Sequence, residues 1–235
     1  MARLARVEAL ETPHHVTQRG NGRRVVFETD SDRLVYLGLL QQHAKQQRLA
    51  ILGYCLMPNH VHLVVVPERE ASLRTALRNA HGRYAAYLNA RQATSGHVWQ
   101  GRYYSCPLGE DHLWAALRYT ERNPVRAGMV GGAAEFPWSS ARIHMGGGWD
   151  GLVDVGLWSA RWTIEEWREF LGATEFERES DAIRHSTHSG RPLGSAHFVK
   201  HLETALARPL AARLGGRPKK KEAFRELASS LLAAM

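Results

Sequence analysis

Residues 57–67 read Met57-Pro58-Asn59-His60-Val61-His62-Leu63-Val64-Val65-Val66-Pro67. The first three residues favour a turn, and the β-branched, apolar run after them predicts a buried strand. Side chains two residues apart on a strand leave the same face, so His60 and His62 can offer two imidazoles to one ion or one phosphate. The opposite face is apolar and can pack on a core through Val61, Leu63 and Val65. An isolated pair of this kind is more often a polar strand end, so the rest of the chain decides its meaning.

The segments around this strand alternate between strand and helix patterns. We expect strands at 14–19, 50–56 and 98–107 and helices at 30–47 and 72–91. Asp30 or Ser31 and Ser72 are the expected N-caps, and the first helix should bury a stripe of Leu34, Val35, Leu39 and Leu40. The order strand-helix-strand-strand-helix-strand predicts an α+β fold, a ferredoxin-like antiparallel sheet with helices on one face.

A further helix is predicted from Glu110 to Asn123, because Pro124 disfavours its continuation. Tyr119 and Asn123 lie one turn apart on this helix. Their face also carries small alanines, which leave open space beside the phenol. Taken alone, Tyr119 is better explained as a tyrosine on a helix surface.

The chain is basic. Its 235 residues carry 31 Lys and Arg against 23 Asp and Glu, a formal net charge of +8, with 44% hydrophobic residues. Such a charge points to a polyanionic partner, most simply nucleic acid, although a merely basic protein has the same composition. Cys55 and Cys106 lack the spacing of metal ligands and are expected to be buried thiols in a reducing cytosol. No signal peptide or membrane-spanning run is recognisable, so we expect a cytoplasmic protein without membrane contact.

Several basic and amide side chains are candidate DNA contacts. Some flank the turn at 20–22, others alternate with aromatic residues at 98–107, and the last belong to two Gly-Arg-Pro triplets and the lysines after them. Solvated loops, a half-buried sheet and a basic linker explain the same patterns. The candidates are Arg19, Asn21, Arg23, Arg24, Gln100, Arg102, Arg191, Arg217, Lys219, Lys220 and Lys221.

A run of three glycines at 146–148 predicts a domain boundary. We expect a catalytic domain at 1–145, a helical extension at 146–210, and a basic tail with a short amphipathic helix at 211–235. The end of the chain is its most basic part, with seven Lys and Arg against two Glu from Arg208 onward.

The two histidines, the tyrosine and the amide together permit one reaction. Neutral imidazole nitrogens and an amide oxygen can hold a divalent cation that keeps open positions. Such a cation can bind a non-bridging phosphate oxygen while a tyrosine phenol attacks the phosphorus in line, giving a covalent phosphotyrosine. Tyr103 and Tyr104 are rival nucleophiles. Glu121 lies on the far side of the helix from Tyr119, so no general base is identified.

These residues carry a family resemblance. His60-Val61-His62 resembles the His-hydrophobic-His signature of HUH endonucleases, and Arg118-Tyr119-Thr120-Glu121-Arg122-Asn123 resembles the nucleophile helix of their single-tyrosine transposase branch. His15-Val16-Thr17-Gln18-Arg19-Gly20-Asn21 and Trp138-Ser139-Ser140 fit the same branch. Thr187-His188-Ser189-Gly190-Arg191-Pro192-Leu193-Gly194 resembles the extension of REP-associated tyrosine transposases. The resemblance covers about residues 10–145 and, more loosely, 180–220.

The resemblance implies a metal-dependent, single-stranded DNA endonuclease and strand transferase. Tyr119 would be the nucleophile that leaves a 5′-phosphotyrosine and a free 3′-hydroxyl, and His60 and His62 would bind Mg²⁺ or Mn²⁺. Asn123 falls where the family places a third metal ligand, although many relatives carry Gln there. The expected substrate is hairpin DNA, a REP-like palindrome with an adjacent short single-stranded tetranucleotide.

The resemblance also bears on assembly and location. Insertion-sequence relatives act as dimers that exchange the tyrosine helix, whereas the long C-terminal extension favours a monomer here. The expected location is the bacterial nucleoid. The alternatives are a non-catalytic DNA-hairpin binder that keeps the fold and an RNA-binding ferredoxin-like module. The second would need stacking aromatics on the central strands, one of which carries His60-Val61-His62 instead.

Overall fold

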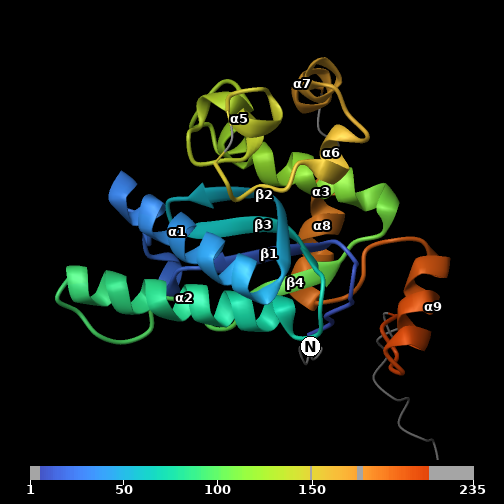
Figure 1. Ribbon diagram of the computed structural model, residues 1–235, viewed down its shortest axis with the longest axis horizontal. Coiled ribbons are helices and arrows are strands. Elements are labelled where there is room, and N and C mark those ends of the chain that lie inside the picture. The colour runs from blue at the N-terminus through green and yellow to red at the C-terminus, as the bar shows by residue number, and fades with distance from the viewer. Residues whose placement is uncertain (1–5, 149, 174–176, 212–235) are drawn as a thin grey trace, which may run out of the picture.

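The computed structural model describes residues 6–148, 150–173 and 177–211. Its centre is a four-stranded antiparallel sheet in the order β2-β3-β1-β4 (Figure 1). The strands are β1 (His14–Arg19), β2 (Leu49–Met57), β3 (His60–Pro67) and β4 (Tyr104–Pro107). This sheet confirms the α+β class and the antiparallel arrangement predicted from the sequence.

The β2–β3 hairpin determines which side chains share a face of the sheet. Its turn is Pro58-Asn59, and Met57 pairs with His60 across it. β1 runs antiparallel to β3, so that Thr17 stands opposite His62. Residues directly opposite each other in an antiparallel pair point to the same face. His60, His62 and Thr17 therefore all leave one face of the sheet.

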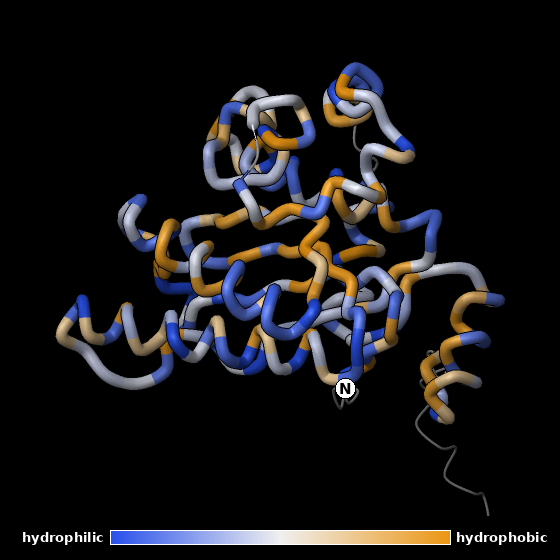
Figure 2. The backbone as a smooth tube through the Cα atoms, viewed as in Figure 1, coloured by the Kyte–Doolittle hydropathy of each residue, from blue (hydrophilic) through white to orange (hydrophobic). Residues whose placement is uncertain are grey.

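Two helices cover the other face, α1 (Asp30–Gln47) and α2 (Ser72–Arg91) (Figure 1). The core beneath them joins the apolar face of β3 to buried aromatic and aliphatic side chains of both helices, among them Val61, Leu63, Val65, Tyr36, Leu40, Tyr84 and Leu88. Figure 2 shows the apolar strands in the interior and hydrophilic stretches on the outer turns of these helices.

Helices also cover the face that carries the histidines. α3 (Glu110–Glu121) packs across β2 and β3, and α8 (Glu177–Ser189) packs against β4 and β1. α7 (Ile164–Gly172) packs against α3. The expectation of helices on one face holds for α1 and α2 but was incomplete for the whole chain. The physical reason is that Val64 and Cys106 on this second face are fully buried and also need an apolar cover.

Shorter elements complete the chain, namely η1 (Asn21–Arg23), α4 (Asn123–Arg126), η2 (Ala133–Glu135), α5 (Ala141–His144), α6 (Gly156–Ser159) and α9 (Ala196–Ala205). Trp167, Leu171 and Ile183, which follow the glycine run, belong to the same buried cluster as Val64 and Leu117. The segment after the glycines thus shares a core with the sheet. The domain boundary at 145/146 stays a prediction. Within the described residues, no helix combines the length and apolarity needed to cross a bilayer.

The caps predicted for α1 and α2 were wrong. Thr29 caps α1, in a capping box with Asp32, because its extended backbone aims the hydroxyl at the first turn. Ala71, in the left-handed conformation, precedes α2, and the Ser72 hydroxyl donates instead to the carbonyls of Gln47 and Arg48.

Two further local predictions differ from the structure. Leu34 is 61% exposed and does not join the buried stripe of α1. Of the strand expected at 98–107, only Tyr104–Pro107 forms β4. Trp99 instead belongs to the core under α2, where its indole donates to the His81 carbonyl.

Candidate active site

The histidine pair lies at the start of β3, on the face that α3 covers. The rings of His60 and His62 are 4.9 Å apart, centroid to centroid, and nearly perpendicular. His62 is buried, and His60 is half-buried. The strand period thus places both imidazoles on one side of the sheet, as the sequence predicted.

The helix tyrosine meets this pair. The Tyr119 ring lies edge-on to the His62 ring at 5.5 Å and to the His15 ring at 5.6 Å. Leu117 of the same helix is buried in the core below, which fixes the rotation of α3 about its axis. Tyr119 itself is 5% exposed.

Asn123 begins α4, one turn after Tyr119, and is also buried. Its amide nitrogen donates to the Tyr119 carbonyl at 3.2 Å. Its amide oxygen accepts a hydrogen bond of 2.9 Å from the Arg126 guanidinium. That guanidinium also lies 4.1 Å from the centroid of the Tyr119 ring, in cation–π geometry.

These side chains line one cavity of about 570 Å³, which we call the histidine–tyrosine cavity. Its walls come from β1, β3, the segment before β4, α3, α4 and α8. The lining includes His15, Thr17, Arg19, Arg23, His60, His62, Gln100, Tyr104, Tyr119, Asn123, Arg126, Arg184, Thr187 and His188.

A hydrogen-bond chain fixes the proton on His62. The Thr187 hydroxyl donates to the Ile183 carbonyl at 2.7 Å, so its oxygen accepts from Nδ1–H of His15 at 2.7 Å. His15 then has only Nε2 left as an acceptor, and it takes the proton of His62 Nδ1 at 3.0 Å. These hydrogen bonds place the proton of His62 on Nδ1 and leave its lone pair on Nε2.

A second, shorter series of hydrogen bonds likewise places the proton of His60 on Nδ1. The Asn59 amide nitrogen donates to the Arg23 carbonyl at 3.2 Å, which identifies the Asn59 oxygen as the acceptor for Nδ1–H of His60 at 2.6 Å. Within the described residues, no hydrogen bond reaches Nε2 of either histidine.

The surroundings keep these imidazoles neutral. Burial lowers the pKa of His60 to about 4, and the charges of Arg19 and Arg126 act in the same direction. The pKa of His62 is held well below its ordinary value, first by burial and then by His60 and His15. Burial also lowers the pKa of His15 to about 3. At neutral pH each ring therefore keeps one nitrogen as an acceptor or ligand.

The donor set fits a divalent cation through two imidazole nitrogens. Both Nε2 atoms carry a lone pair, and each ring is oriented by a hydrogen bond at Nδ1, as metal-binding histidines commonly are. The Asn123 oxygen, by contrast, is bonded to the Arg126 cation. No group of three His, Cys, Asp or Glu side chains suited to a metal occurs in the described part of the chain.

The candidate DNA contacts separate into several places. Arg19, Arg23 and Gln100 line the histidine–tyrosine cavity, and Asn21 is exposed in η1 beside it. Arg24 donates to Gln92, and Arg191 donates to the carbonyls of Leu210 and Ala211. Arg102 lines a different cavity, on the α2 side of the sheet. Arg217, Lys219, Lys220 and Lys221 lie outside the described residues.

Sequence reasoning missed several residues of the cavity as site residues. His15 was noted only as part of a motif, although its place on β1 opposite Val64 puts it on the histidine face. Arg126 follows Asn123 at helical spacing, which was a usable signal. Arg184, Thr187 and His188 come from α8, and no local pattern reveals where that helix packs.

The rival tyrosines and Glu121 also have defined places. Tyr104 lines the histidine–tyrosine cavity and contacts the His188 ring, with the ring centroids 4.8 Å apart. Tyr103 is buried on the α2 side beneath the Arg6 guanidinium. Glu121 is fully buried away from Tyr119, where its carboxylate accepts from His144, Ser140 and Trp167.

The sheet, the two strand histidines and the helix tyrosine all lie within a part of the chain that matches a family model. Residues 10–123 match the model of the family described as "Transposase IS200 like", and the chain belongs to this family through that domain.

One solved structure supports the fold, and a second is only a similar chain. A REP-associated tyrosine transposase bound to a REP hairpin is 15% identical, covers 75% of this chain and 96% of its own, and has a TM-score of 0.55. A predicted transposase from Deinococcus radiodurans R1 is 18% identical, covers 52% of this chain and 97% of its own, and has a TM-score of 0.36. No curated protein matches the chain.

Proposed function

We propose that this chain is a metal-dependent, single-stranded DNA endonuclease and strand transferase that acts on hairpin DNA. The observation that carries the proposal is that His60, His62 and Tyr119 line one cavity, with the Tyr119 ring 5.5 Å from that of His62. A nucleophile beside a pair of imidazole nitrogens that can hold a metal suits metal-assisted phosphoryl transfer to tyrosine.

In the proposed step, the Tyr119 phenol oxygen attacks a backbone phosphorus in line. The new Tyr119 O–P bond forms as the P–O3′ bond breaks, giving a 5′-phosphotyrosine and a free 3′-hydroxyl. The phenol proton is balanced by the proton that the leaving 3′-oxygen gains. Rejoining reverses the same atoms, so the strand can be transferred without a nucleotide cofactor.

His60 and His62 are the proposed metal ligands, through Nε2 of each ring. When bound there, Mg²⁺ or Mn²⁺ supplies positive charge to a non-bridging phosphate oxygen. The Arg126 guanidinium, 4.1 Å from the Tyr119 ring centroid, adds a second positive charge near the attacking oxygen. Asn123 remains a proposed third ligand, and it requires that its oxygen leave Arg126.

Hairpin DNA of REP type, with an adjacent short tetranucleotide, is the proposed substrate. A fold relative was solved with a REP hairpin, and the cavity here opens beside exposed Arg19, Arg23 and Gln100. Guanidinium and amide groups suit phosphate and base contacts of a single strand.

The test is a covalent-adduct assay on hairpin DNA with a single-stranded flank, in the presence of Mn²⁺. The wild-type chain should give a protein–DNA adduct that survives denaturing electrophoresis. Tyr119→Phe should abolish the adduct and Tyr104→Phe should retain it, whereas loss with Tyr104→Phe alone would move the nucleophile to Tyr104. His60→Ala should remove the dependence on Mn²⁺ together with the cleavage.

A second candidate function is hairpin binding without cleavage. It is favoured by two observations, since Tyr119 is only 5% exposed and the Asn123 oxygen is already bonded to Arg126. A chain that binds the hairpin but gives no adduct with either Mg²⁺ or Mn²⁺ would establish this function in place of the first.

A further inference from the structure

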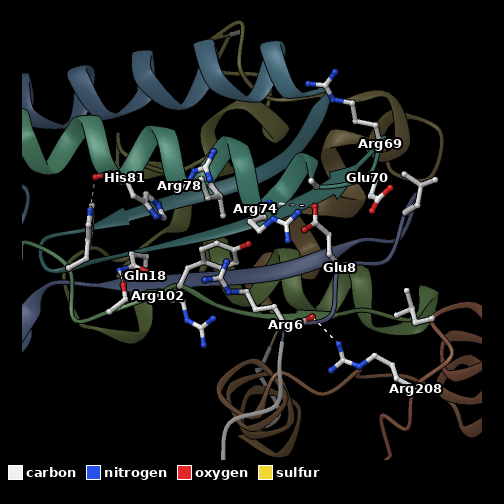
Figure 3. Close-up of a pocket in the computed structure, with 17 residues that line it drawn as sticks. Arg6, Glu8, Gln18, Arg69, Glu70, Arg74, Arg78, His81, Arg102 and Arg208 are labelled. Carbon is white, nitrogen blue, oxygen red and sulfur yellow. Dashed lines mark hydrogen bonds between the residues drawn. The ribbon is translucent and has the colours of Figure 1, made fainter.

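We propose that a second cavity, on the α2 side of the sheet, binds the phosphates of a nucleic acid strand (Figure 3). We call it the arginine cavity, because six arginines line it, Arg6, Arg69, Arg74, Arg78, Arg102 and Arg208. Its volume is about 1030 Å³, larger than that of the histidine–tyrosine cavity.

The two cavities lie on opposite faces of one sheet. Thr17 of β1 lines the histidine–tyrosine cavity, and its neighbour Gln18 lines the arginine cavity. Successive side chains of a strand point to opposite faces, so Thr17 and Gln18 show that the two cavities lie on opposite sides of β1. The segment before β4 also borders both, since Gln100 lines the first cavity and Arg102 the second.

The arginine cavity carries an excess of positive charge. Only Glu8 and Glu70 oppose its six arginines. The Glu8 carboxylate is already engaged, because it accepts from the backbone nitrogens of Leu73 and Arg74 at 2.8 and 3.4 Å. Burial raises the pKa of Glu8, while the nearby charges of Arg74 and Arg6 act in the opposite direction.

Arg74 and Arg78 are the arginines best placed for a ligand. Both are exposed, and they stand one turn apart on α2, on the same face of the helix (Figure 3). Neither side chain forms an ion pair with another described residue. Guanidinium groups held in this way suit successive phosphates of one strand.

Arg6, Arg69 and Arg208 contact other residues of the protein at the edge of the cavity. The Arg6 guanidinium lies 3.9 Å from the centroid of the Tyr103 ring, and the Arg6 carbonyl accepts from Arg208 at 3.2 Å. Arg69 donates to the backbone carbonyls of Gln46 and Gln47 at the end of α1. The Arg6–Arg208 contact joins segments near both ends of the described chain, and Glu8 links the first of them to α2 through the Leu73 nitrogen.

The aromatic residues of this cavity decide what part of the strand is recognised. Trp99 is 8% exposed and Tyr103 is 4% exposed and covered by Arg6, so neither offers a free face to a base. Without stacking, binding depends on the phosphates and is independent of base sequence. This inference rests on the proposed function only in taking DNA as the ligand.

The test measures binding of fluorescein-labelled oligothymidylate to the full chain across a salt series. The chain carries Tyr119→Phe throughout, so that the result does not depend on cleavage. Each phosphate contact contributes about 0.7 to the slope of log affinity against log salt for a single strand. We expect Arg78→Gln to lower the slope by about 0.7 and Arg74→Gln/Arg78→Gln by about 1.4.

Arg83→Gln is the matched control, because Arg83 is an exposed arginine of α2 that lines neither cavity. An unchanged slope in the double variant, or an equal loss with Arg83→Gln, would overturn the inference. So would displacement of the oligonucleotide by thymidine triphosphate at equal phosphate concentration, which would assign the cavity to a free nucleotide. Loss of the Tyr119 adduct in the separate cleavage assay would contradict the proposed reaction and leave these slopes unaffected.

Discussion

The hydrogen bonds around His62 make a residue of α8 part of the candidate active site. Thr187 lies outside the region that matches the family model, yet its hydroxyl orients His15, and His15 in turn orients His62. Groups that hold the second nitrogen of a metal-binding histidine typically change metal affinity by about 10- to 100-fold when removed. The proposed metal site therefore depends on α8.

Thr187→Val tests this dependence. It removes the acceptor for His15 Nδ1–H, so that His15 no longer has to accept from His62. We expect Mn²⁺ affinity, measured by titration calorimetry on the DNA-free chain, to fall by about 10-fold. Thr187→Ser keeps the hydroxyl and should restore the affinity, whereas wild-type affinity in Thr187→Val would contradict the proposed role.

His81 gives a pH dependence of stability. Burial lowers its pKa to about 3, and its Nε2 accepts from the Tyr36 hydroxyl at 3.0 Å. The unfolded chain binds this proton near the ordinary pKa of about 6.5, so the stabilisation is complete above that pH and is lost as the pH falls toward the folded value.

His81→Gln should flatten this dependence, since Gln can accept from Tyr36 without titrating. Between about pH 5.5 and 4.5, where the unfolded histidine is mostly protonated, urea unfolding of the wild type should lose about 1.3 kcal/mol more than the variant loses. Parallel curves for the two proteins would show that His81 is not the titrating group.

At the scale of elements, Glu121 ties three helices together. It ends α3, and its carboxylate accepts from Ser140, which precedes α5, from His144 of α5 and from Trp167 of α7. All of these contacts are buried, so the rotation of α3 that aims Tyr119 is held from the side opposite the cavity. The sequence predicts that Glu121 lies on the side of the helix opposite Tyr119, and its position in the structure agrees with that prediction.

Glu121→Ala should therefore destabilise the fold strongly. His144 and Trp167 lose their buried acceptor, while Ser140 can still donate to the Tyr54 carbonyl. Each unsatisfied donor costs about 1–3 kcal/mol, so the loss should be at least about 2 kcal/mol in urea unfolding. Glu169→Ala, at an exposed position of α7, is the control and should change little. A small loss for Glu121→Ala would remove the anchoring role.

The elements near the histidines could be predicted because their patterns are local. Alternation placed His60 and His62 on one face, and helical spacing placed Tyr119 and Asn123 one turn apart. The cap of α2 could not be predicted in this way, because Ser72 forms its bonds with residues about 25 positions away. The Thr29–Asp32 capping box of α1, by contrast, is a local signal that was missed. The exposure of Leu34 could not be predicted from the helical pattern either, since an apolar residue on a helix can still face solvent.

At the scale of the molecule, the cavity is built by segments distant in sequence. His15, Arg126 and Thr187 meet only because α3 and α8 pack on the same face of the sheet. Such packing follows from buried clusters that join the whole chain, and no motif records it. The hydrogen bond from Arg126 to the Asn123 amide oxygen likewise forms only in the folded protein and has no local sequence signal.

The position of Tyr119 also bears on the oligomeric state. Tyr119 faces His62 of its own chain, so one chain holds both halves of the proposed site. We therefore propose that the protein is a monomer, and light scattering should give a mass near 26.4 kDa. Twice that mass, with adduct formation restored by mixing His60→Ala and Tyr119→Phe chains, would show that subunits exchange the tyrosine helix.

Peptide mapping of the covalent product is the decisive measurement for the proposed reaction. The adduct formed with Mn²⁺ and hairpin DNA is digested with nuclease and protease and analysed by mass spectrometry. We predict a single nucleotide-bearing peptide that contains Tyr119, linked through a 5′-phosphate. A modified peptide that contains Tyr104 instead, or no modified peptide under conditions where the hairpin is bound, would contradict the proposal.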